Sequence, residues 1–550
     1  MKKESNKRPR VAYFSMEYGL HEDFKIYSGG LGILAGDILK AAKDGKYPLV
    51  GVGILWRQGY TKQLIGEDGE PYDCYPAYRY EFLKDTGVVV RIRIKGRHVK
   101  ARVLLCTKYN NVPLYLLDTN IPDNQDMLIT GQLYGWFSEE RVAQEMILGI
   151  GGVRALRALG IDVDIYHLND SHSVLTGIEL ITEKMDDKGM SFEEAWEKTR
   201  EQIVFTTHTP VEAGNECHDH ELLKYLGAYN GLTHGQMLRL GGEPFSMTVA
   251  SLRLSKKANA VSELHGVTAR KMWRDVGGIS EIISITNGVH NATWQDKRVT
   301  NAYNVGSDLW APHMEAKKEM IEEIHKRNGV KLSENSLTIG IARRAAPYKR
   351  SNLIFSKKKV IEPLLNEGKI QIVISGKAHP NDLSGKEIVA NLFRMSKMYP
   401  ESVVFLQDYD MKTGKILTKG CDVWLNNPIR PMEACGTSGM KAAMNGVLNV
   451  SILDGWWPEG CMHGVNGWQI GSGYEGEDQD IIDMECLYRV LLEEVIPTYY
   501  EKREKWVEMM KASIEMSRKK FSAARVVQDY YNYMYIAGDG SLFDKTLSRV

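Results

Sequence analysis

The sequence predicts an α/β fold made of two Rossmann-like, doubly wound domains that face a cleft. The chain has 550 residues, the length of two large α/β domains or about three average ones. Short runs of β-branched and apolar residues alternate with longer helical patterns, as they do in parallel sheets. Polar or charged residues follow the ends of several of these runs, which is where α/β proteins bind their ligands.

The first half of the chain opens with a β-α-β unit. Residues 10–15 and 49–54 have the apolar, β-branched character of strands, and residues 33–44 between them have a helical pattern. Further elements are expected as strands at residues 91–95, 103–107, 112–117, 163–168, 203–206 and 282–286, and as a helix at residues 141–159. The first three of these strands look antiparallel, because Asn110-Asn111 marks a tight turn.

The second half repeats the pattern with new strands. They are expected at residues 337–342, 371–375 and 403–406, and charged or polar residues follow each of them. Residues 305–335 are charged and helical and form a connector. We therefore expect two domains, residues 1–290 and 291–550. Helices are expected over residues 484–537, with a terminal helix that can pack back on the first domain.

Composition and spacing exclude several classes of protein. Lys and Arg total 70, as do Asp and Glu, so no overall positive charge favours nucleic acid. The longest apolar run, residues 47–56, is about half as long as a membrane span. The seven cysteines form no C-x-x-C pair and no signal peptide opens the chain, so we expect reduced thiols and a cytoplasmic protein. No H-E-x-x-H motif or Cys/His ligand spacing is present, so no metal is expected.

A glycine-rich loop, Tyr27-Ser28-Gly29-Gly30-Leu31-Gly32, lies between the first strand and the first helix. Its glycines let the backbone approach an anion near a helix N-terminus. The loop matches neither G-x-G-x-x-G nor G-x-x-x-x-G-K-[ST], the two common phosphate-binding spacings. On its own, a purely structural turn explains it equally well.

A second segment, Glu433-Ala434-Cys435-Gly436-Thr437-Ser438-Gly439-Met440-Lys441, leads into a helix expected at residues 440–445. Backbone N–H groups and the hydroxyls of Thr437 and Ser438 can hold a phosphate. Lys441 would fall in the first helical turn, where the helix dipole lowers the pKa of an ammonium and favours a Schiff base. A solvated surface lysine is the alternative, and spacing alone favours it.

Four cations follow the expected strand 337–342 within eight residues, in Arg343-Arg344-Ala345-Ala346-Pro347-Tyr348-Lys349-Arg350. Such a density of cations indicates a site for a doubly charged anion, and a solvated basic turn is an equal alternative. His167, His172 and His208 stand alone at strand ends, where a structural hydrogen-bonding role is the more common one.

Six segments, in this order, resemble those of the α-glucan (glycogen/maltodextrin) phosphorylase family in its short bacterial and archaeal type. They are SMEYGLHEDFKIYSGGLGILAGDILKAA, YHLNDSH at 166–172, FTTHTPVEAG at 205–214, ITNGV at 285–289, ARRAAPYKR at 342–350 and EACGTSGMKAAMNGVLNVSILDG at 433–455. The resemblance extends from Val11 to the region of Ile470.

The resemblance implies the glycosyltransferase-B form of the two-domain architecture. It also implies pyridoxal 5′-phosphate bound to Lys441. In this family the phosphate of the cofactor, and not its aldehyde, exchanges a proton with the substrate phosphate. The residues that would lie at the cofactor, besides Lys441, are Gly436, Thr437, Ser438, Arg343, Tyr409 and Gly30.

The resemblance assigns further roles. Arg344 and Lys349 would hold inorganic phosphate, Glu433 and Asn287 would bind glucose hydroxyls, and the His208 backbone would line the same pocket. The expected catalytic residues are therefore Arg344, Lys349, His208 and Glu433. The expected substrate-binding residues are Gly29, Leu31, Asn287, Tyr348, Asp170 and His172.

Two departures from longer family members are Arg343, where they carry Lys, and Ala346-Pro347, where they carry His-Glu. The second departure puts fine regulation or substrate contacts in doubt, and not the anion site. The chain also has little room for an N-terminal regulatory region, so allosteric regulation is expected to be absent. The expected reaction is phosphorolysis of (1→4)-α-glucans to α-glucose 1-phosphate with retention, in carbohydrate storage metabolism.

The expected partners are an α-glucan or maltodextrin and inorganic phosphate, without nucleic acid or membrane, and a homodimer is left open. A nucleotide-sugar-dependent glucan synthase of the same architecture is the alternative function. Such a synthase needs no Schiff-base lysine, so Lys441 argues against it. A non-catalytic glucan-binding module is a third hypothesis, and the set of cations and hydroxyl-binding residues argues against that one.

Overall fold

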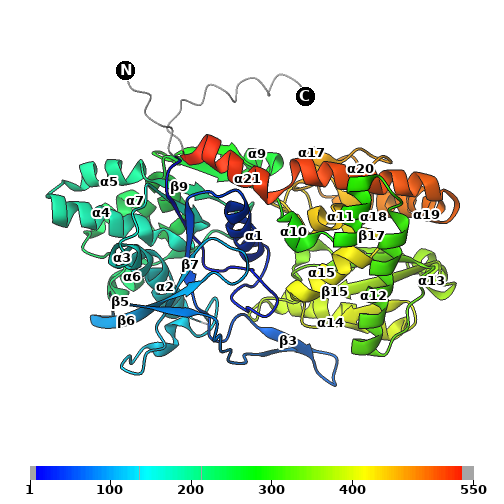
Figure 1. Ribbon diagram of the computed structural model, residues 1–550, viewed down its shortest axis with the longest axis horizontal. Helices are drawn as coiled ribbons and strands as arrows, with labels where there is room; N and C mark the ends of the chain where they lie inside the picture. The colour runs from blue at the N-terminus through cyan, green and yellow to red at the C-terminus, as the bar shows by residue number, and fades with distance from the viewer. Residues whose placement is uncertain (1–7, 136, 212–213, 536–550) are drawn as a thin grey trace, which may run out of the picture.

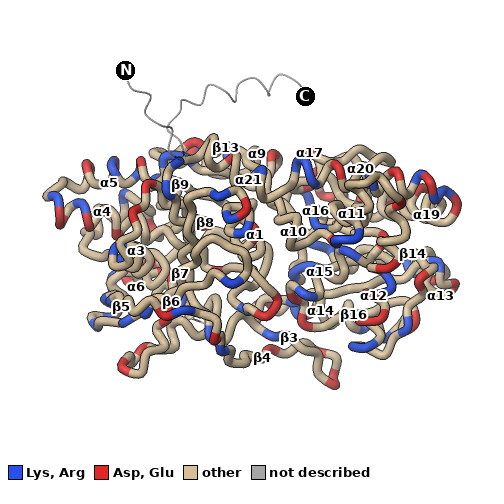
Figure 2. Tube along the Cα trace, viewed as in Figure 1, with Lys and Arg blue, Asp and Glu red and all other residues tan. Residues whose placement is uncertain are grey.

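The structure, a computed structural model that describes residues 8–135, 137–211 and 214–535, is organised around two separate sheets (Figure 1). The larger sheet has nine strands in the order β13-β12-β9-β8-β1-β2-β7-β6-β5. The smaller sheet has six strands in the order β16-β15-β14-β17-β18-β19. Lys and Arg are interspersed with Asp and Glu over both parts of the molecule (Figure 2).

The nine-stranded sheet is parallel from β13 to β7, and only the pairs β7–β6 and β6–β5 are antiparallel. Its strands are β1 Val11–Phe14, β2 Leu49–Ile54, β5 Lys84–Ile94, β6 Arg97–Cys106, β7 Leu114–Asp118, β8 Ile165–Asn169, β9 Ile203–Thr206, β12 Lys257–Ala260 and β13 Glu281–Ser284. Two parallel strands must be joined by a crossover connection, which is usually a helix. One or more helices connect most of the successive parallel strands of this sheet.

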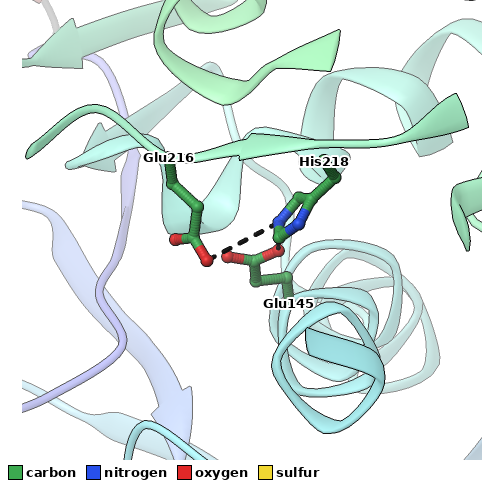
Figure 3. Close-up of side chains that lie close together, drawn as sticks. All are labelled: Glu145, Glu216 and His218. Carbon is green, nitrogen blue, oxygen red and sulfur yellow. Dashed lines mark hydrogen bonds and ion pairs between the residues drawn. The ribbon is translucent and has the colours of Figure 1, made fainter. Parts of the chain in front are cut away.

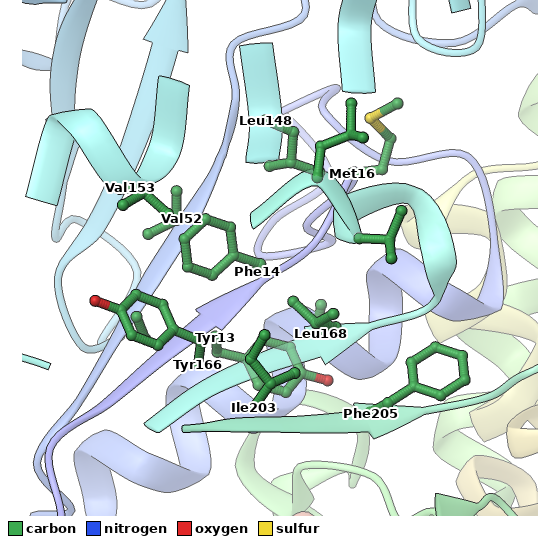
Figure 4. Packing of buried hydrophobic residues seen from close by; sticks show 14 of the residues in the cluster. Tyr13, Phe14, Met16, Val52, Leu148, Val153, Tyr166, Leu168, Ile203 and Phe205 are labelled. Atoms are coloured by element: carbon green, nitrogen blue, oxygen red, sulfur yellow. The ribbon is translucent and has the colours of Figure 1, made fainter. Parts of the chain in front are cut away.

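The central strand β1 is buried over its whole length, because helices cover both faces of the sheet. Phe14 points to the side of Val52 and Val153 (Figure 4). A Cβ added at Gly152 would lie 2.5 Å from the Phe14 ring and 2.9 Å from Val52. The glycine is therefore what lets the following helix approach the sheet so closely.

The helices of the first part include one long helical stretch that is not a uniform α-helix. The sequence predicts a helix over residues 141–159, and the structure has α2, a π-helical turn and α3 there. The helices are α1 Gly30–Asp44, α2 Ser138–Met146, the π turn Ile147–Gly151, α3 Gly152–Ala158, α4 Leu175–Lys188, α5 Phe192–Arg200, α6 His220–Leu226, α7 His234–Gly241, α8 Met247–Leu254 and α9 Glu263–Trp273.

Every strand pair of the six-stranded sheet is parallel. Its strands are β14 Leu337–Ala342, β15 Ile370–Ser375, β16 Val403–Leu406, β17 Val423–Asn426, β18 Leu448–Ile452 and β19 Gly467–Ile470. In β15, Ile370, Ile372 and Ile374 belong to one core cluster, whereas Val373 belongs to another. The sheet therefore separates two apolar layers.

The helices of the second part divide between these two layers. Helices α12 and α15 contribute to the layer around Val373, and α13, α14, α18 and α20 contribute to the other. Their bounds are α10 Asn291–Trp294, α11 Lys297–Val305, α12 Trp310–Asn328, α13 Lys358–Asn366, α14 Leu383–Met398, α15 Met411–Gly420, α16 Thr437–Ala443, α17 Trp457–Gly460, α18 Gln479–Val490, α19 Ile496–Glu501 and α20 Arg503–Lys520.

The end of the described chain returns to the first part. Helix α21 (Ala523–Asp529) and the π-helical segment Tyr530–Tyr535 bury Ala523, Val526 and Tyr530 in the same core cluster as β1. Helix α21 packs against α1, and Figure 1 shows it at the top of the first part. The polypeptide therefore crosses between the two parts twice.

A hairpin from the first part also reaches across to the second. It consists of β3 (Lys62–Ile65) and β4 (Pro71–Cys74). Asp73 forms an ion pair with Lys386 at 2.7 Å, and the side chain of Gln63 exchanges two hydrogen bonds with the backbone of Ala378. Nearer the glycine loop, Lys25 pairs with Asp410 at 2.9 Å, again across the two parts.

The predicted mixed α/β fold with parallel sheets is confirmed. The strands expected at 49–54, 203–206, 337–342 and 403–406 have the predicted bounds. The first helix begins at Gly30, three residues before the predicted start. None of the described helices has both the length and the apolar character that a membrane-spanning helix requires.

Candidate active site

A cavity of about 850 Å³ lies where the carboxyl ends of both sheets meet. Loops after β1, β8, β9 and β13 line it from the first part, and loops after β14, β15, β16 and β17 line it from the second. Every site residue predicted from the sequence lines this cavity. They are Gly29, Gly30, Leu31, Asp170, His172, His208, Asn287, Arg343, Arg344, Tyr348, Lys349, Tyr409, Glu433, Gly436, Thr437, Ser438 and Lys441.

The glycine loop is open toward the cavity and fixed from behind. A Cβ added at Gly29 or Gly30 would meet nothing within 4 Å. Behind the loop, the buried carboxylate of Glu17 accepts hydrogen bonds from the backbone N–H groups of Ser28 and Gly29, at 2.5 and 3.1 Å. Tyr134 donates to the same carboxylate at 2.6 Å. Glu17 therefore sets the shape of the loop, a role that sequence reasoning missed.

Lys441 is buried at the wall of the cavity, and among the described residues its ammonium has no hydrogen bond or ion pair. Its one close contact is with the ring of Trp294, whose centroid lies 3.7 Å from Nζ. Burial lowers the pKa of Lys441 to about 8, although the negative charge of Asp37 opposes this shift. An amine in this state is partly neutral near physiological pH, which is what a nucleophilic lysine requires.

The physical cause of this shift differs from the predicted one. The sequence places Lys441 in the first turn of a helix that starts at residue 440, so that the helix dipole would act on it. Instead, α16 begins at Thr437, and Lys441 lies in its second turn. Because a helix dipole fades after the first turn, burial is the effect that matters here.

The backbone from Gly436 to Ser438 also lines the cavity. Gly436 has a φ of 83°, the left-handed region that a residue with a side chain rarely adopts. No side chain caps the first turn of α16. The Ser438 hydroxyl accepts a hydrogen bond from the Trp424 indole at 3.2 Å, so its proton is free to be donated elsewhere.

Arg343 and Arg344 follow β14 directly and differ in how firmly they are held. Arg343 donates from Nη1 to Asn426 at 2.7 Å and from Nη2 to Asn427 at 2.9 Å. Burial lowers the pKa of Arg343 to about 10. The side chain of Arg344 is exposed on the wall of the cavity. Arg343 is therefore fixed in place, whereas Arg344 is accessible to an anion.

Lys349 and Glu433 pair with each other inside the cavity wall, with 2.6 Å between Nζ and Oε2. Burial alone would lower the pKa of Lys349, but the neighbouring Glu433 outweighs it and the pKa is raised. The backbone N–H of Glu433 donates to the buried carboxylate of Asp454 at 2.9 Å. The lysine therefore carries its positive charge in the cavity, and Glu433 is held by Lys349 at its side chain and by Asp454 at its backbone.

Arg350 lies outside the cavity, so the four clustered cations do not form one anion site. Its side chain is 6 % exposed and donates to the backbone oxygens of Asn427 and Pro428. It also pairs with Asp483 at 2.6 Å and with Asp480 at 2.7 Å. Only Arg343, Arg344 and Lys349 of this cluster line the cavity.

On the opposite wall, two histidines are held as neutral groups. Burial lowers the pKa of His208 to about 3, and its Nε2 lies 2.7 Å from Asn169 Oδ1. Burial also lowers the pKa of His172 to about 4, and its Nδ1 has no hydrogen-bond partner among the described residues. Asp170 holds a φ of 72°, an uncommon conformation for a residue other than glycine.

Asn287 presents an unpaired oxygen to this cavity. The side chain is buried, and no described group donates a hydrogen bond to its Oδ1. Buried polar atoms in folded proteins nearly always have a partner, so a polar ligand is the natural one here. The backbone oxygens of Thr286 and Asn287 both accept from Arg525 Nη2, at 2.6 and 3.1 Å. Arg525 belongs to α21, which sequence reasoning did not connect with the site.

His167 has a structural role, which agrees with the more common expectation for a lone histidine. Its Nδ1 lies 2.7 Å from the Tyr535 hydroxyl, and its Nε2 lies 2.7 Å from Thr206 Oγ1. It does not line the cavity.

A cluster of Glu145, Glu216 and His218 lies at the edge of the cavity, with ligand atoms within 4.8 Å of one another (Figure 3). Such a group can bind a metal ion, but here it is paired internally. Arg141 donates to both oxygens of Glu216, at 3.3 Å or less, and His218 contacts Glu145 at 3.1 Å. Burial raises the pKa of Glu145 to about 7. The guanidinium thus supplies the positive charge that a metal ion would bring.

Comparison with known proteins gives one consistent result. A family model described as carbohydrate phosphorylase matches residues 153–228 and 255–457. The chain is 39% identical to a maltodextrin phosphorylase of Thermococcus litoralis, covering 96% of this chain and 70% of that protein. It is 35% identical to a glycogen phosphorylase of Aquifex aeolicus, covering 97% and 87%. It is also 36% identical to an uncharacterized protein of Methanocaldococcus jannaschii, covering 96% of this chain and 99% of that one.

Proposed function

The chain belongs to the carbohydrate phosphorylase family, and on this premise we propose that it catalyses phosphorolysis of (1→4)-α-glucans. Inorganic phosphate would cleave the terminal glucosyl unit and release α-glucose 1-phosphate with retention, as part of carbohydrate storage metabolism. The architecture would be of the glycosyltransferase-B type, with domains at residues 1–290 and 291–550 and the reaction in the cavity between them.

Lys441 is the observation that carries this proposal. A buried ammonium that rests on an aromatic ring, with no hydrogen bond or ion pair among the described residues, is costly unless the lysine has a use. Pyridoxal 5′-phosphate fits the residues around it. The aldehyde would attach to Lys441, and the phosphate would be held by Gly436, Thr437 and Ser438. When bound, the cofactor supplies a phosphate group that can donate and accept a proton.

Arg343 and Tyr409 would complete the cofactor site. Arg343 is held by Asn426 and Asn427, so its positive charge has a fixed position in the wall of the cavity that Gly436–Ser438 also line. Tyr409 lines the same cavity, and burial raises the pKa of its hydroxyl, so the ring stays neutral. A fixed cation and a neutral ring suit the phosphate and the pyridine ring, respectively.

Arg344 and Lys349 would bind the substrate phosphate. Two phosphate groups that exchange a proton must lie close together, and two dianions at that distance repel each other strongly in a cavity shielded from water. Cations placed between and around them offset that repulsion. The positions of Arg343, Arg344 and Lys349 on one wall of the cavity support this assignment.

Glucan binding would use the other wall. Asn287 Oδ1 and His172 Nδ1 are buried and without a described partner, so each can bond a sugar hydroxyl. Glu433 is fixed by Lys349 and by Asp454, and can accept from a second hydroxyl. Gly29, Gly30 and Leu31 would cover the glucosyl unit, because nothing fills the space in front of the two glycines.

The experiment that tests the function joins two measurements. Borohydride reduction followed by peptide mapping should place a pyridoxyl group on Lys441. Maltodextrin breakdown should require inorganic phosphate and yield α-glucose 1-phosphate. A protein that carries no pyridoxyl label and transfers glucose from a nucleotide sugar without phosphate would instead be the synthase.

A further inference from the structure

Asp37 is a fully buried carboxylate two turns into α1, directly behind the cavity wall. Both of its oxygens accept a hydrogen bond from the Trp294 indole N–H, at 3.1 and 2.8 Å. Oδ2 also accepts from the backbone N–H of His290, at 3.1 Å. A buried carboxylate is retained only where its hydrogen bonds are satisfied. Here the donors come from the segment that follows Asn287.

Trp294 lies between this carboxylate and Lys441. Its N–H points to Asp37, and the Lys441 ammonium lies 3.7 Å from the centroid of its ring. The indole N–H has no other described partner, so Asp37 alone fixes that edge of the ring. A donor bonded to an anion is also polarised, which strengthens the attraction of the ring face for a cation.

We propose that Asp37 is a positioning residue for Lys441: it holds Trp294 so that the indole face seats the lysine side chain, and it supplies a negative charge that acts on that amine. The inference rests on the proposed function, in which Lys441 carries the cofactor. Asp37 itself touches neither the cofactor site nor the substrate site. It acts through Trp294 and through its charge.

The other charged groups around this pair are mostly neutralised elsewhere. Lys441 also faces Lys415, which pairs with Glu22 at 2.7 Å. Asp37 also faces His290 and Lys40. His290 bonds Asp44 at 2.8 Å, and Lys40 donates to the Leu20 oxygen and to Thr293. The described acceptors of Lys40 are neutral oxygens, so removing the charge of Asp37 is expected to act on Lys40 as well as on Lys441.

The experiment measures how readily Lys441 is alkylated at different pH values. The full chain is freed of any bound aldehyde with hydroxylamine and dialysis, then methylated with formaldehyde and cyanoborohydride between pH 6 and 10. Mass spectrometry of the Lys441 peptide gives the pH of half-maximal labelling. In Asp37→Asn this midpoint should fall by about one pH unit, because an anion that favours the ammonium has been removed.

Asp44→Asn is the matched control. It makes the same change on the same helix, at a carboxylate that faces His290 and not Lys441, and it should leave the midpoint unchanged. Asp37→Glu keeps the charge and should restore most of the wild-type value. An unchanged midpoint in a folded Asp37→Asn protein would overturn the proposal.

Trp294→Phe tests the positioning role separately, and it keeps the proposal testable if Asp37→Asn does not fold. The phenyl ring cannot donate to Asp37, so the lysine should be seated less firmly and labelled several-fold faster at pH 10. Wild-type labelling at that pH would overturn the positioning role. These readings do not need the cofactor. If pyridoxal phosphate fails to load on wild-type Lys441, the proposed function fails while the link between Asp37 and Lys441 can still be measured.

Discussion

Lys349 and Glu433 form a buried ion pair in which Nζ and Oε2 are 2.6 Å apart. They come from loops after β14 and β17, strands that are neighbours in the six-stranded sheet. The proposed phosphate cation and the proposed glucose-binding carboxylate are thus fixed relative to each other by the fold. Binding of one substrate is expected to change the charge environment of the other.

This pair predicts a measurable energetic coupling. Lys349→Met or Glu433→Gln leaves one buried charge without its partner, and each should destabilise the protein by about 3–5 kcal/mol. The double variant should be less destabilised than the sum of the two, by about 1–3 kcal/mol. Urea unfolding of the four proteins measures this coupling. Strict additivity would show that the two charges do not interact in solution.

Arg344 should dominate the affinity for phosphate. Arg344→Ala should raise the KM for phosphate and lower kcat, with a loss in kcat/KM equivalent to about 2–4 kcal/mol for a desolvated, charge-assisted contact. Arg344→Lys should rescue poorly, because the bidentate fork is lost. Arg394→Ala, on the exposed surface of α14, is the control. Wild-type phosphate kinetics in Arg344→Ala would show that the cation cluster is only a solvated turn.

Arg350, unlike Arg344, should affect the stability of the protein and not the binding of phosphate. Arg350→Ala removes the buried partner of Asp483 and two hydrogen bonds to backbone oxygens. It should lower the free energy of unfolding by about 3–5 kcal/mol. The KM for phosphate of the remaining folded enzyme should stay near the wild-type value. A large rise in that KM with unchanged stability would contradict the placement of Arg350 outside the cavity.

Lys441 should make the stability of the cofactor-free chain depend on pH. Burial lowers the pKa of Lys441 to about 8, below its ordinary value of 10.5. Between these values the unfolded chain holds a proton that the folded chain has lost, so stability rises with pH in this window. Lys441→Met has no such penalty. It should therefore be more stable than wild type at pH 7, and its advantage should shrink from pH 8 to 10.5.

Arg525 should affect the KM for the glucan and not the KM for phosphate. Its guanidinium donates to the backbone oxygens of Thr286 and Asn287, so it fixes the loop that presents the Asn287 side chain. Arg525→Gln should raise the KM for maltodextrin several-fold and leave the KM for phosphate unchanged. Lys511→Gln, on the exposed side of α20, serves as the control. Equal changes in both constants would point to a general loss of structure.

The strands that the sequence predicts well are made mostly of apolar and β-branched residues. Residues 203–206 and 337–342 need only burial on both faces to be recognised. Strands β12 and β18 were missed because each carries an asparagine. In the structure, Asn259 accepts from Thr206 and Asn449 donates to the Gly439 oxygen. Those hydrogen-bond partners belong to other elements, so no local sequence pattern predicts them.

The same distinction applies to the candidate site. Local motifs single out the residues that line the cavity, because glycines and cations next to strand ends are visible in the sequence. Glu17, Asp37, Trp294 and Arg525 hold those residues in place, and their roles depend on partners that are distant in the sequence. Arg350 belongs to the motif but points away, since Asp480 and Asp483 from α18 bind it.

The return of α21 to the first part of the molecule bears on how the chain folds during synthesis. The core around β1 includes side chains from residues 523–535, which follow the second part in the chain. Domains usually fold in the order in which they are made. Here the first part cannot complete its core until the second part has been translated. The nascent N-terminal half must therefore expose an apolar groove for α21 during most of translation, and a chaperone that covers this groove should speed its folding.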